Sequence, residues 1–180
     1  MDGIINENEE VLMEKCRLVI VSDAHNYIEG FDQVLEQEPN ADYYLDLGDN
    51  FCIENPTESF LKRWCSVRGN NDYYPFPKSR NFTIFNKNIR MLHGENMVWV
   101  YNTYSEMIEF MKMENVDVLL MGHTHRRAYV EKENRIIINP GSLGRTREYD
   151  MYEQGLGTYC VLTIYEDGKI EHEFKTIERH

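Results

Sequence analysis

The sequence lacks the features that direct a chain into a membrane or an oxidising compartment. No stretch approaches the roughly 20 consecutive apolar residues of a membrane-spanning helix. The opening residues Met1 to Lys15 are polar and acidic, without the basic and apolar regions of a signal peptide. The four cysteines are scattered and form no Cys-x-x-Cys pair, which is typical of reduced, buried thiols. We therefore expect a cytoplasmic protein without a membrane partner.

A basic run is also missing. The 31 acidic and 19 basic residues give the chain a formal net charge of −12. A field of that sign disfavours binding to a nucleic-acid backbone, so we expect no long nucleic acid as a partner. An acidic protein can still act on a phosphate if bound cations supply local positive charge.

The chain of 180 residues is long enough for one domain with a full core. We expect a polar N-terminal extension at residues 1–15, either frayed or helical near its end, and a single α/β domain at residues 16–180. Apolar, β-branched runs predict strands at residues 17–22, 43–47, 65–68 and 116–121. Amphipathic spacing predicts helices near residues 31–38, 56–64 and 104–113, and turn residues predict hairpins around 86–88, 131–134 and 166–168.

The predicted strands share one property, which is a polar cluster directly after the last strand residue. The most apolar run leads into Met121-Gly122-His123-Thr124-His125, and the strand at 17–22 leads into Asp23 and His25. For either pair alone, surface histidines or a helix-capping aspartate are alternatives. Ligand sites of open α/β sheets lie at the carboxyl ends of strands. A shared ion site therefore explains best why five strands end in such clusters, at residues 23–25, 48–50, 69–72, 93–94 and 122–125.

The candidate ligands combine imidazole nitrogen with carboxylate and amide oxygen, and include no thiolate. They are Asp23, His25, Asp49, Asn70, His93, His123 and His125. This set suits Mn²⁺, Fe or Zn²⁺ and argues against a cysteine-rich structural zinc site. The set exceeds the needs of one ion and suffices for two if one carboxylate bridges them, and two-metal sites serve in-line displacement at phosphorus. The remaining histidines, His172 and His180, are expected to be exposed.

Taken together and in order, the motifs resemble the calcineurin-like metallophosphoesterase superfamily, and most closely its small, capless YfcE-type phosphodiesterase group. The motifs are Asp23-x-His25, Gly48-Asp49, Gly69-Asn70-x-Asp72, His93-Gly94, Gly122-His123-x-His125 and the later loop Asn139-Pro140-Gly141-Ser142-x-Gly144. The resemblance implies a four-layer α/β/β/α sandwich of two mixed sheets with flanking helices. It places a dimetal site at the strand C-terminal ends.

The resemblance also implies which residues bind the two divalent ions. One ion would be held by Asp23, His25 and His125. The other would be held by Asn70, His93 and His123, with Asp49 as the bridge. We expect Mn²⁺, with Fe, Zn²⁺ and Ni²⁺ as alternatives, because geometry and availability decide that choice.

The implied activity is hydrolysis of small phosphate esters, preferentially diesters, by a hydroxide that bridges the ions. Larger family members have a histidine that protonates the leaving group, and Asn71 stands in that position here. No side-chain general acid is therefore assigned, and we expect esters with good leaving groups to be cleaved best. The small group commonly has His-Gly-His where this chain has His93-Gly94-Glu95. Glu95 either binds water or alters metal preference near the cleft, or it faces solvent.

Substrate contacts are predicted at Asn71, Asp72, Ser142 and Arg147, with Arg145 as a second candidate and exposed loop arginines as the alternative. Two other functional classes stay open. One is a non-catalytic metal-binding scaffold for protein–protein interaction, since the retromer scaffold subunit resembles the same small fold. The other is a nuclease or cyclic-nucleotide phosphodiesterase. The small group often forms dimers, which implies a homodimer.

Overall fold

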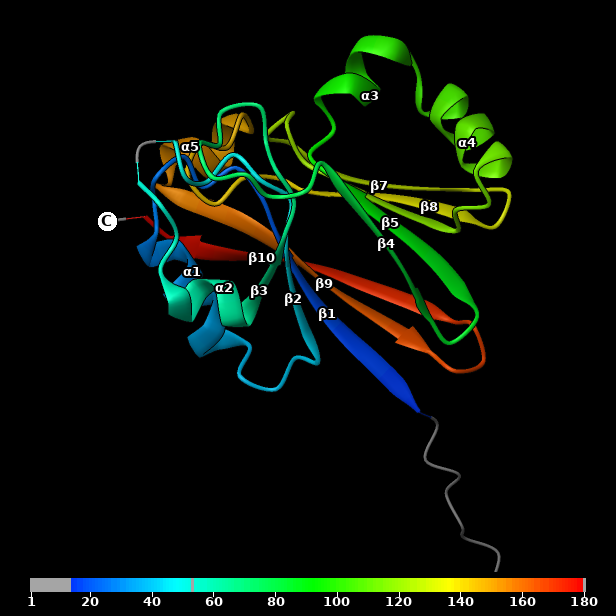
Figure 1. Cartoon of the computed structure of the whole chain (residues 1–180), viewed down its shortest axis with the longest axis horizontal. Coiled ribbons are helices and arrows are strands. Elements are labelled where there is room, and N and C mark those ends of the chain that lie inside the picture. Colours follow the sequence, from blue (N-terminus) through cyan, green and yellow to red (C-terminus); the bar gives the residue numbers. More distant parts are fainter. Residues whose placement is uncertain (1–13, 53, 180) are drawn as a thin grey trace, which may run out of the picture.

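The computed structural model describes residues 14–52 and 54–179. They form two five-stranded sheets that pack face to face, with helices on both outer faces (Figure 1). This is the predicted four-layer α/β/β/α sandwich. Most of the predicted N-terminal extension, residues 1–13, lies outside the described residues, as does His180. Lys15, assigned to that extension, is the first residue of strand β1.

The first sheet has the strand order β10-β9-β1-β2-β3. Strand β1 runs parallel to β2, and β2 runs parallel to β3, whereas β9 is antiparallel to both β1 and β10. The parallel strands β1, β2 and β3 therefore end at the same edge. The bounds are β1 Lys15–Val21, β2 Tyr43–Asp46, β3 Trp64–Ser66, β9 Leu156–Tyr165 and β10 Ile170–Glu178.

The second sheet has the strand order β4-β5-β6-β8-β7. Strands β5, β6 and β8 are parallel, and the antiparallel strands β4 and β7 close the two edges. The bounds are β4 Ser79–Ile84, β5 Lys87–Leu92, β6 Val118–Met121, β7 Arg127–Lys132 and β8 Arg135–Pro140. Both sheets are mixed, as the family resemblance implied.

The central strands are apolar throughout because both of their faces are buried. In β1, Leu18 and Ile20 belong to the core between the sheets, where they join Met91 and Leu120 of the second sheet. Val19 and Val21 point the other way and pack beneath the helices on the outer face. Alternate residues of β1 thus belong to two hydrophobic cores, one between the sheets and one beneath the helices.

Helices α1 (Glu29–Gln37) and α2 (Glu58–Arg63) cover the first sheet through Phe31, Val34 and Phe60. Helices α3 (Glu95–Val100) and α4 (Tyr104–Met113) cover the second sheet through Met97 and Met107. A capping box between Thr103 and Glu106 fixes the start of α4, so the predicted bounds of this helix are confirmed. Among the described residues, no helix is long and apolar enough to cross a membrane.

Helices α3 and α5 (Tyr149–Glu153) were not predicted, because they have only six and five residues and present at most one buried side chain. Two hairpin turns are also shorter than expected. They occupy Phe85–Asn86 and Glu133–Asn134, so Lys87 and Asn88 already pair in β5. Positive φ angles at Glu133 (53°) and Asn134 (57°) give the tight turn that matches the strand twist. His172 is exposed as predicted, and its ring stacks on Tyr129.

Candidate metal centre

The strand ends of the two sheets meet at one edge of the sandwich. The backbone N–H of Asp23, after β1, donates to the carbonyl of Gly48, after β2, at 2.9 Å. In the second sheet, Gly122 after β6 donates to the carbonyl of His93 after β5 at 2.8 Å. The N–H of His123 then reaches the carboxylate of Asp23 at 3.0 Å and joins the two sheets. Clusters that are far apart in the sequence are thereby brought together.

Most of the candidate ligands have a left-handed backbone. The φ angles are 57° at Asp23, 47° at His25, 60° at Asp49, 68° at His123 and 59° at His125. Each such residue costs about 1–3 kcal/mol, and conformations of this kind cluster at functional sites. The chain turns sharply at these residues as it leaves each strand. The strain is therefore concentrated on the residues predicted to bind metal.

Two glycines make room for these turns. A Cβ atom on Gly69 would lie 2.1 Å from Oδ1 of Asp49, and one on Gly122 would lie 1.9 Å from Oγ of Ser22. Both distances are far below van der Waals contact, so the loops can approach the carboxylates only because these positions carry no side chain. The glycines of the sequence motifs are thus explained by close packing around Asp49 and Asp23.

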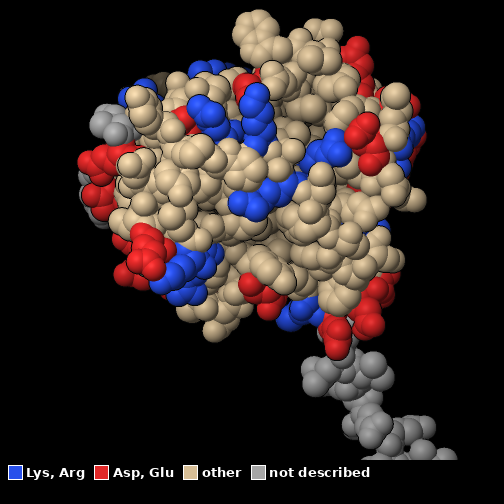
Figure 2. Space-filling model, viewed as in Figure 1, with Lys and Arg blue, Asp and Glu red and all other residues tan. Residues whose placement is uncertain are grey.

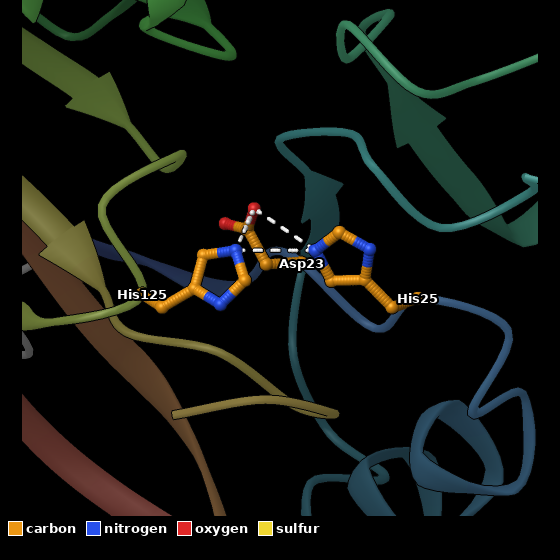
Figure 3. A group of neighbouring side chains, drawn as sticks. All are labelled: Asp23, His25 and His125. Atoms are coloured by element: carbon orange, nitrogen blue, oxygen red, sulfur yellow. Dashed lines mark hydrogen bonds and ion pairs between the residues drawn. The ribbon is translucent and has the colours of Figure 1, made fainter. Parts of the chain in front are cut away.

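One group of ligands consists of Asp23, His25 and His125 (Figure 3). Their ligand atoms lie within 4.8 Å of one another. Nε2 of His125 is 3.2 Å from Oδ1 of Asp23, and Nε2 of His25 is 3.9 Å from the same oxygen. The two Nε2 atoms are 3.1 Å apart, and Figure 3 shows the rings facing each other beside the carboxylate. These are the three residues that the resemblance assigned to one ion.

A second group consists of Asp23, Asp49 and His93. Nε2 of His93 lies 3.3 Å from Oδ2 of Asp49 and 4.0 Å from Oδ1 of Asp23. Nδ1 of His123 lies 3.2 Å from the same Nε2 atom, so His123 faces this group as well. Asp23 is the carboxyl common to both groups, whereas the resemblance implied a bridging role for Asp49. That role of Asp49 stays a prediction.

Backbone carbonyls orient two of the imidazole rings. Nδ1 of His93 is 2.8 Å from the carbonyl oxygen of Leu47, and Nδ1 of His125 is 2.5 Å from that of Arg145. A ring nitrogen that donates to a carbonyl leaves the lone pair of the other nitrogen free for a metal. Nε2 of both rings faces the carboxylates, so Nε2 is the nitrogen that each ring can offer to a metal.

The local charges shift the pKa values of these ligands in both directions. Burial lowers the pKa of His93, but its hydrogen bond with Asp49 and the charge of Asp23 outweigh burial and raise that pKa to about 9. Burial raises the pKa of Asp49, yet hydrogen bonds from His93 and Asn71 hold it well below its usual range. Burial also lowers the pKa of His25. A proton on His93 thus neutralises Asp49, and a divalent cation would take the place of that proton.

Oδ1 of Asp23 is the atom that tests whether the donor set fits a metal. Asp23 is fully buried, and its Oδ2 accepts from Oγ of Ser22 at 2.5 Å. Oδ1 is buried and has no hydrogen-bond donor among the described residues. An unpaired buried carboxylate oxygen is costly, and a metal ion removes that cost. Because imidazole nitrogens lie on two sides of Oδ1, the residues fit divalent cations.

The two asparagines after β3 lie in different environments. Asn71 donates to Asp49 from its backbone N–H at 2.7 Å and from its side-chain Nδ2 at 2.6 Å. Its amide therefore covers the side of Asp49 that faces the cleft. Asn70, the predicted ligand, is exposed and lines the same cleft. Glu95 is half-buried at the start of α3, and its charge acts on His123.

Two predicted substrate contacts are buried beneath the cleft instead of lining it. The carboxylate of Asp72 accepts four backbone N–H groups, from Asp49, Asn50, Phe51 and Gly69, at 2.7–2.8 Å. Ser142 is fully buried, and its Oγ donates to the carbonyl of Asp23 at 2.7 Å. These hydrogen bonds use the polar atoms of both side chains. Both residues position the ligand loops, and the prediction that they touch substrate is corrected accordingly.

A cleft of about 770 Å³ opens beside the ligands. Its lining includes His25, Asp49, Asn71, His123 and His125, together with Arg145, Arg147, Tyr152 and Arg179. Of the predicted substrate contacts, Asn71 and Arg147 are thus in the cleft. Arg179 was not predicted, because it follows β10 at the far end of the chain and has no motif around it. Only the pairing of β9 with β10 brings it here.

Comparison with known proteins shows to which family the chain is similar. The sequence profile described as the calcineurin-like phosphoesterase superfamily domain matches residues 16–167. The chain is 27% identical to a probable metallophosphoesterase of Methanocaldococcus jannaschii over 129 residues, 68% of this chain and 66% of that protein. It is 25% identical to a probable metallophosphoesterase of Mycoplasma pneumoniae over 150 residues, 82% of this chain and 89% of that protein.

Solved structures share the fold at lower identity. A predicted phosphoesterase of Streptococcus pneumoniae superposes with a TM-score of 0.70 at 17% identity, covering 92% of this chain and 99% of that one. Vacuolar protein sorting 29 of Cryptosporidium parvum superposes with a TM-score of 0.65 at 17% identity, covering 92% of this chain and 99% of that one. A novel archaeal phosphodiesterase gives 0.64 at 20% identity, covering 88% of this chain and 99% of that one.

The fold, the donor set and the matched relatives define a metal-dependent phosphoesterase, which is a hydrolase. The chain belongs to the calcineurin-like phosphoesterase superfamily, since the family profile covers residues 16–167, well over half of the chain. Members of that family act on phosphate esters with divalent metal ions, and the ligand groups described above are suited to hold such ions.

Proposed function

We propose that the protein hydrolyses phosphodiesters at a centre of two divalent metal ions, with Mn²⁺ as the first candidate. The observation that carries the proposal is the buried Oδ1 of Asp23, which has no hydrogen-bond donor among the described residues and lies near three imidazoles. The ligands would be Asp23, His25, Asp49, Asn70, His93, His123 and His125. Divalent ions held there would activate water as the nucleophile and offset the negative charge on the phosphate oxygens.

The chain's own residues keep this arrangement rigid. Asp72 ties the loops after β2 and β3 together through its four backbone contacts, and Ser142 ties the loop after β8 to Asp23. The arginines of the cleft bring positive charge to the place where a phosphate would enter. Rigid placement of ligands within about 0.5 Å is what such chemistry requires.

Asn71 is the reason to prefer diesters and good leaving groups. An amide cannot protonate a departing alkoxide at neutral pH, and both donor groups of Asn71 are engaged by Asp49. The cleft therefore offers no titratable group at the position where larger family members have their acid. A leaving group such as p-nitrophenolate needs no such help.

A non-catalytic scaffold is the second candidate, because vacuolar protein sorting 29 has the same fold. The imidazole and carboxylate ligands of this chain are all present and face one another, which supports the enzyme. A cyclic-nucleotide phosphodiesterase or a nuclease acting on short substrates would use the same chemistry. The net charge of −12 opposes long nucleic acid as a substrate.

The direct test compares bis(p-nitrophenyl) phosphate with p-nitrophenyl phosphate. The protein is treated with a chelator and reconstituted with Mn²⁺, Zn²⁺, Ni²⁺ or Fe²⁺, beside the variant Asp49→Asn. The control is Asp32→Asn, which changes an exposed carboxylate on α1. We expect metal-dependent turnover that favours the diester, is lost in Asp49→Asn and is kept in Asp32→Asn. Binding of two ions without turnover in any metal would support the scaffold instead.

A further inference from the structure

Three arginines from two segments line the cleft beside the ligand histidines. Arg145 and Arg147 belong to the loop between β8 and α5, and Arg179 directly follows β10. We call these residues the arginine wall. Figure 2 shows that basic and acidic side chains are interspersed over the face it views, so the surface there is not uniformly acidic. In a chain with a net charge of −12, three arginines lining one cleft are a marked local reversal of charge.

The arginine wall has no carboxylate partner among residues 14–52 and 54–179. The arginines that do form ion pairs in this part of the chain are Arg17, Arg90, Arg127 and Arg135. Arg127 is an example: its Nε and Nη2 donate to the carboxylate of Glu148, the residue after Arg147, at 2.7–3.0 Å. The structure thus neutralises the arginine beside the loop and leaves those of the cleft available to a ligand.

Arg179 is held in place by the loop that carries the other two arginines. Its Nη1 donates to the carbonyl of Gly144 at 2.6 Å, and its guanidinium lies 5.4 Å from the ring centre of Tyr152. Its Nη2 donates to the carbonyl of Tyr152 at 3.5 Å. These contacts fix the guanidinium at the wall of the cleft, and a fixed guanidinium is suited to a planar or tetrahedral anion.

Counting charges shows that a simple diester would not use this wall. Two divalent ions would bring about four positive charges, and Asp23, Asp49, a hydroxide nucleophile and one diester would together neutralise them. The three guanidinium groups would then remain in the cleft without a counter-charge. A further phosphomonoester group brings about 1.5 to 2 negative charges at neutral pH and offers several acceptor oxygens.

We infer that the arginine wall binds a second phosphate, so that the substrates are phosphodiesters that also carry a phosphomonoester group. A nucleoside phosphodiester with a phosphate on its other hydroxyl is an example of this class. The cleft of about 770 Å³ is within the range of sites for ligands of that size. The inference rests on the proposed function, because it names the substrate class of the same cleft.

The arginine wall lies beside the ligand histidines, because His25, His123 and His125 line the same cleft as Arg145, Arg147 and Arg179. The backbone of the loop between β8 and α5 contacts His125 directly, since the N–H of Arg147 donates to its carbonyl at 3.0 Å.

The test uses two esters that differ by one phosphate: thymidine 5′-(4-nitrophenyl phosphate) with and without a 3′-phosphate. For the Mn²⁺-loaded protein we expect kcat/KM to be at least about tenfold higher for the 3′-phosphorylated ester, since each charge-assisted contact is worth about that factor. Arg147→Gln and Arg179→Gln should each reduce this preference several-fold. Arg63→Gln is the matched control, because Arg63 is exposed on α2 away from the cleft.

A binding measurement separates this inference from the proposed function. Calorimetry with chelator-treated protein should show that thymidine 3′,5′-bisphosphate binds more weakly to Arg147→Gln than to wild type and Arg63→Gln. Arg147 is exposed, so its variant is expected to fold even if Arg179→Gln disturbs the loop. Arginine-dependent binding without turnover would count against the proposed function alone. Turnover with equal kcat/KM for both esters, or a preference unchanged in both variants, would overturn the arginine wall as a phosphate site.

Discussion

Two buried carboxylates in this protein solve the same problem in different ways. Glu38, at the end of α1, is 1% exposed, and it accepts from Arg17 at 2.5 Å, Lys175 at 2.6 Å and Tyr159 at 2.9 Å. Asp23 is equally buried, but its Oδ1 has no donor among the described residues. The chain supplies its own cations to Glu38. At Asp23 it supplies imidazoles, which can hold either a proton or a metal ion.

Asp46 shows a third solution. It is fully buried, and its Oδ2 has no partner among the described residues. Neither a cation nor an imidazole is among its partners, which are Gly48 and Asn50. Burial raises the pKa of Asp46 to about 7, so this carboxyl holds a proton below that pH. The comparison teaches that a buried carboxylate marks a metal site only where nitrogen ligands surround its unpaired oxygen.

The largest expected effect is on metal binding at Asp23. The variant Asp23→Asn removes the negative charge that both ligand groups share, so we expect metal affinity to fall by at least about a hundredfold. Titration of Mn²⁺ into chelator-treated protein, followed by calorimetry, measures this loss. Thermal melting should show Mn²⁺ stabilising the wild type and the Glu38→Gln variant, but not Asp23→Asn. Equal stabilisation of all three would remove the distinction between the two carboxylates.

The next effect is on folding, and it concerns Glu38. The variant Glu38→Gln leaves Arg17 and Lys175 without their buried anion, so we expect the free energy of unfolding to fall by about 3 kcal/mol. Urea denaturation monitored by circular dichroism measures it, with Glu36→Gln as the control because Glu36 is exposed on the same helix. Burial raises the pKa of Glu38, but the bonds from Lys175, Tyr159 and Arg17 outweigh burial and lower it.

The sign of the pH dependence follows from that lowered pKa. A carboxyl that ionises more easily in the fold stabilises the protein above its ordinary pKa of 4.5, and that stabilisation is lost as the pH falls below it. Glu38→Gln should therefore lose less stability than wild type on acidification. An identical acid dependence of wild type and variant would contradict the structural role of this ion cluster.

Asp46 is expected to show the opposite pH dependence. Because its pKa rises from 3.8 to about 7 on folding, the folded state holds a proton that the unfolded state releases, and stability falls as the pH rises from about 4 to 7. The isosteric variant Asp46→Asn cannot release this proton and avoids the loss. Its free energy of unfolding, relative to that of the wild type, should therefore rise by up to about 4 kcal/mol between pH 4 and pH 7. Urea denaturation at several pH values measures it. A wild type and variant with parallel profiles would show that Asp46 stays ionised in the fold.

The smallest effect concerns Asn71, which donates to Asp49 from the cleft side. A histidine there could donate a proton to a poor leaving group, so Asn71→His should raise kcat for an alkyl phosphomonoester or a cyclic nucleotide by about tenfold, the low end for an added acid. The same variant should change kcat for bis(p-nitrophenyl) phosphate little, because p-nitrophenolate leaves without a proton. A kcat for monoesters that does not rise would mean that Asn71 does not occupy the position of the acid.

The sequence by itself determined the strands and the clusters at their ends. A β-branched apolar run followed by Asp, His or Asn is a local signal, because burial on both faces and a sharp turn each affect only a few neighbouring residues. The members of the two ligand groups, the glycines of the motifs and the bounds of α4 were therefore predictable from short stretches. Helices α3 and α5 were not, since a helix of five or six residues carries too little periodicity.

The tertiary structure alone decided how those clusters share their charges. Strand order brings His123 to Asp23, a hundred positions away in the sequence, and makes Asp23 the carboxyl common to both ligand groups. The same order buries Asp72 and Ser142 as loop anchors and carries Arg179 from the end of the chain into the cleft. These contacts depend on which strands pair. The packing of the whole core sets that pairing, so no single stretch of sequence is enough to predict it.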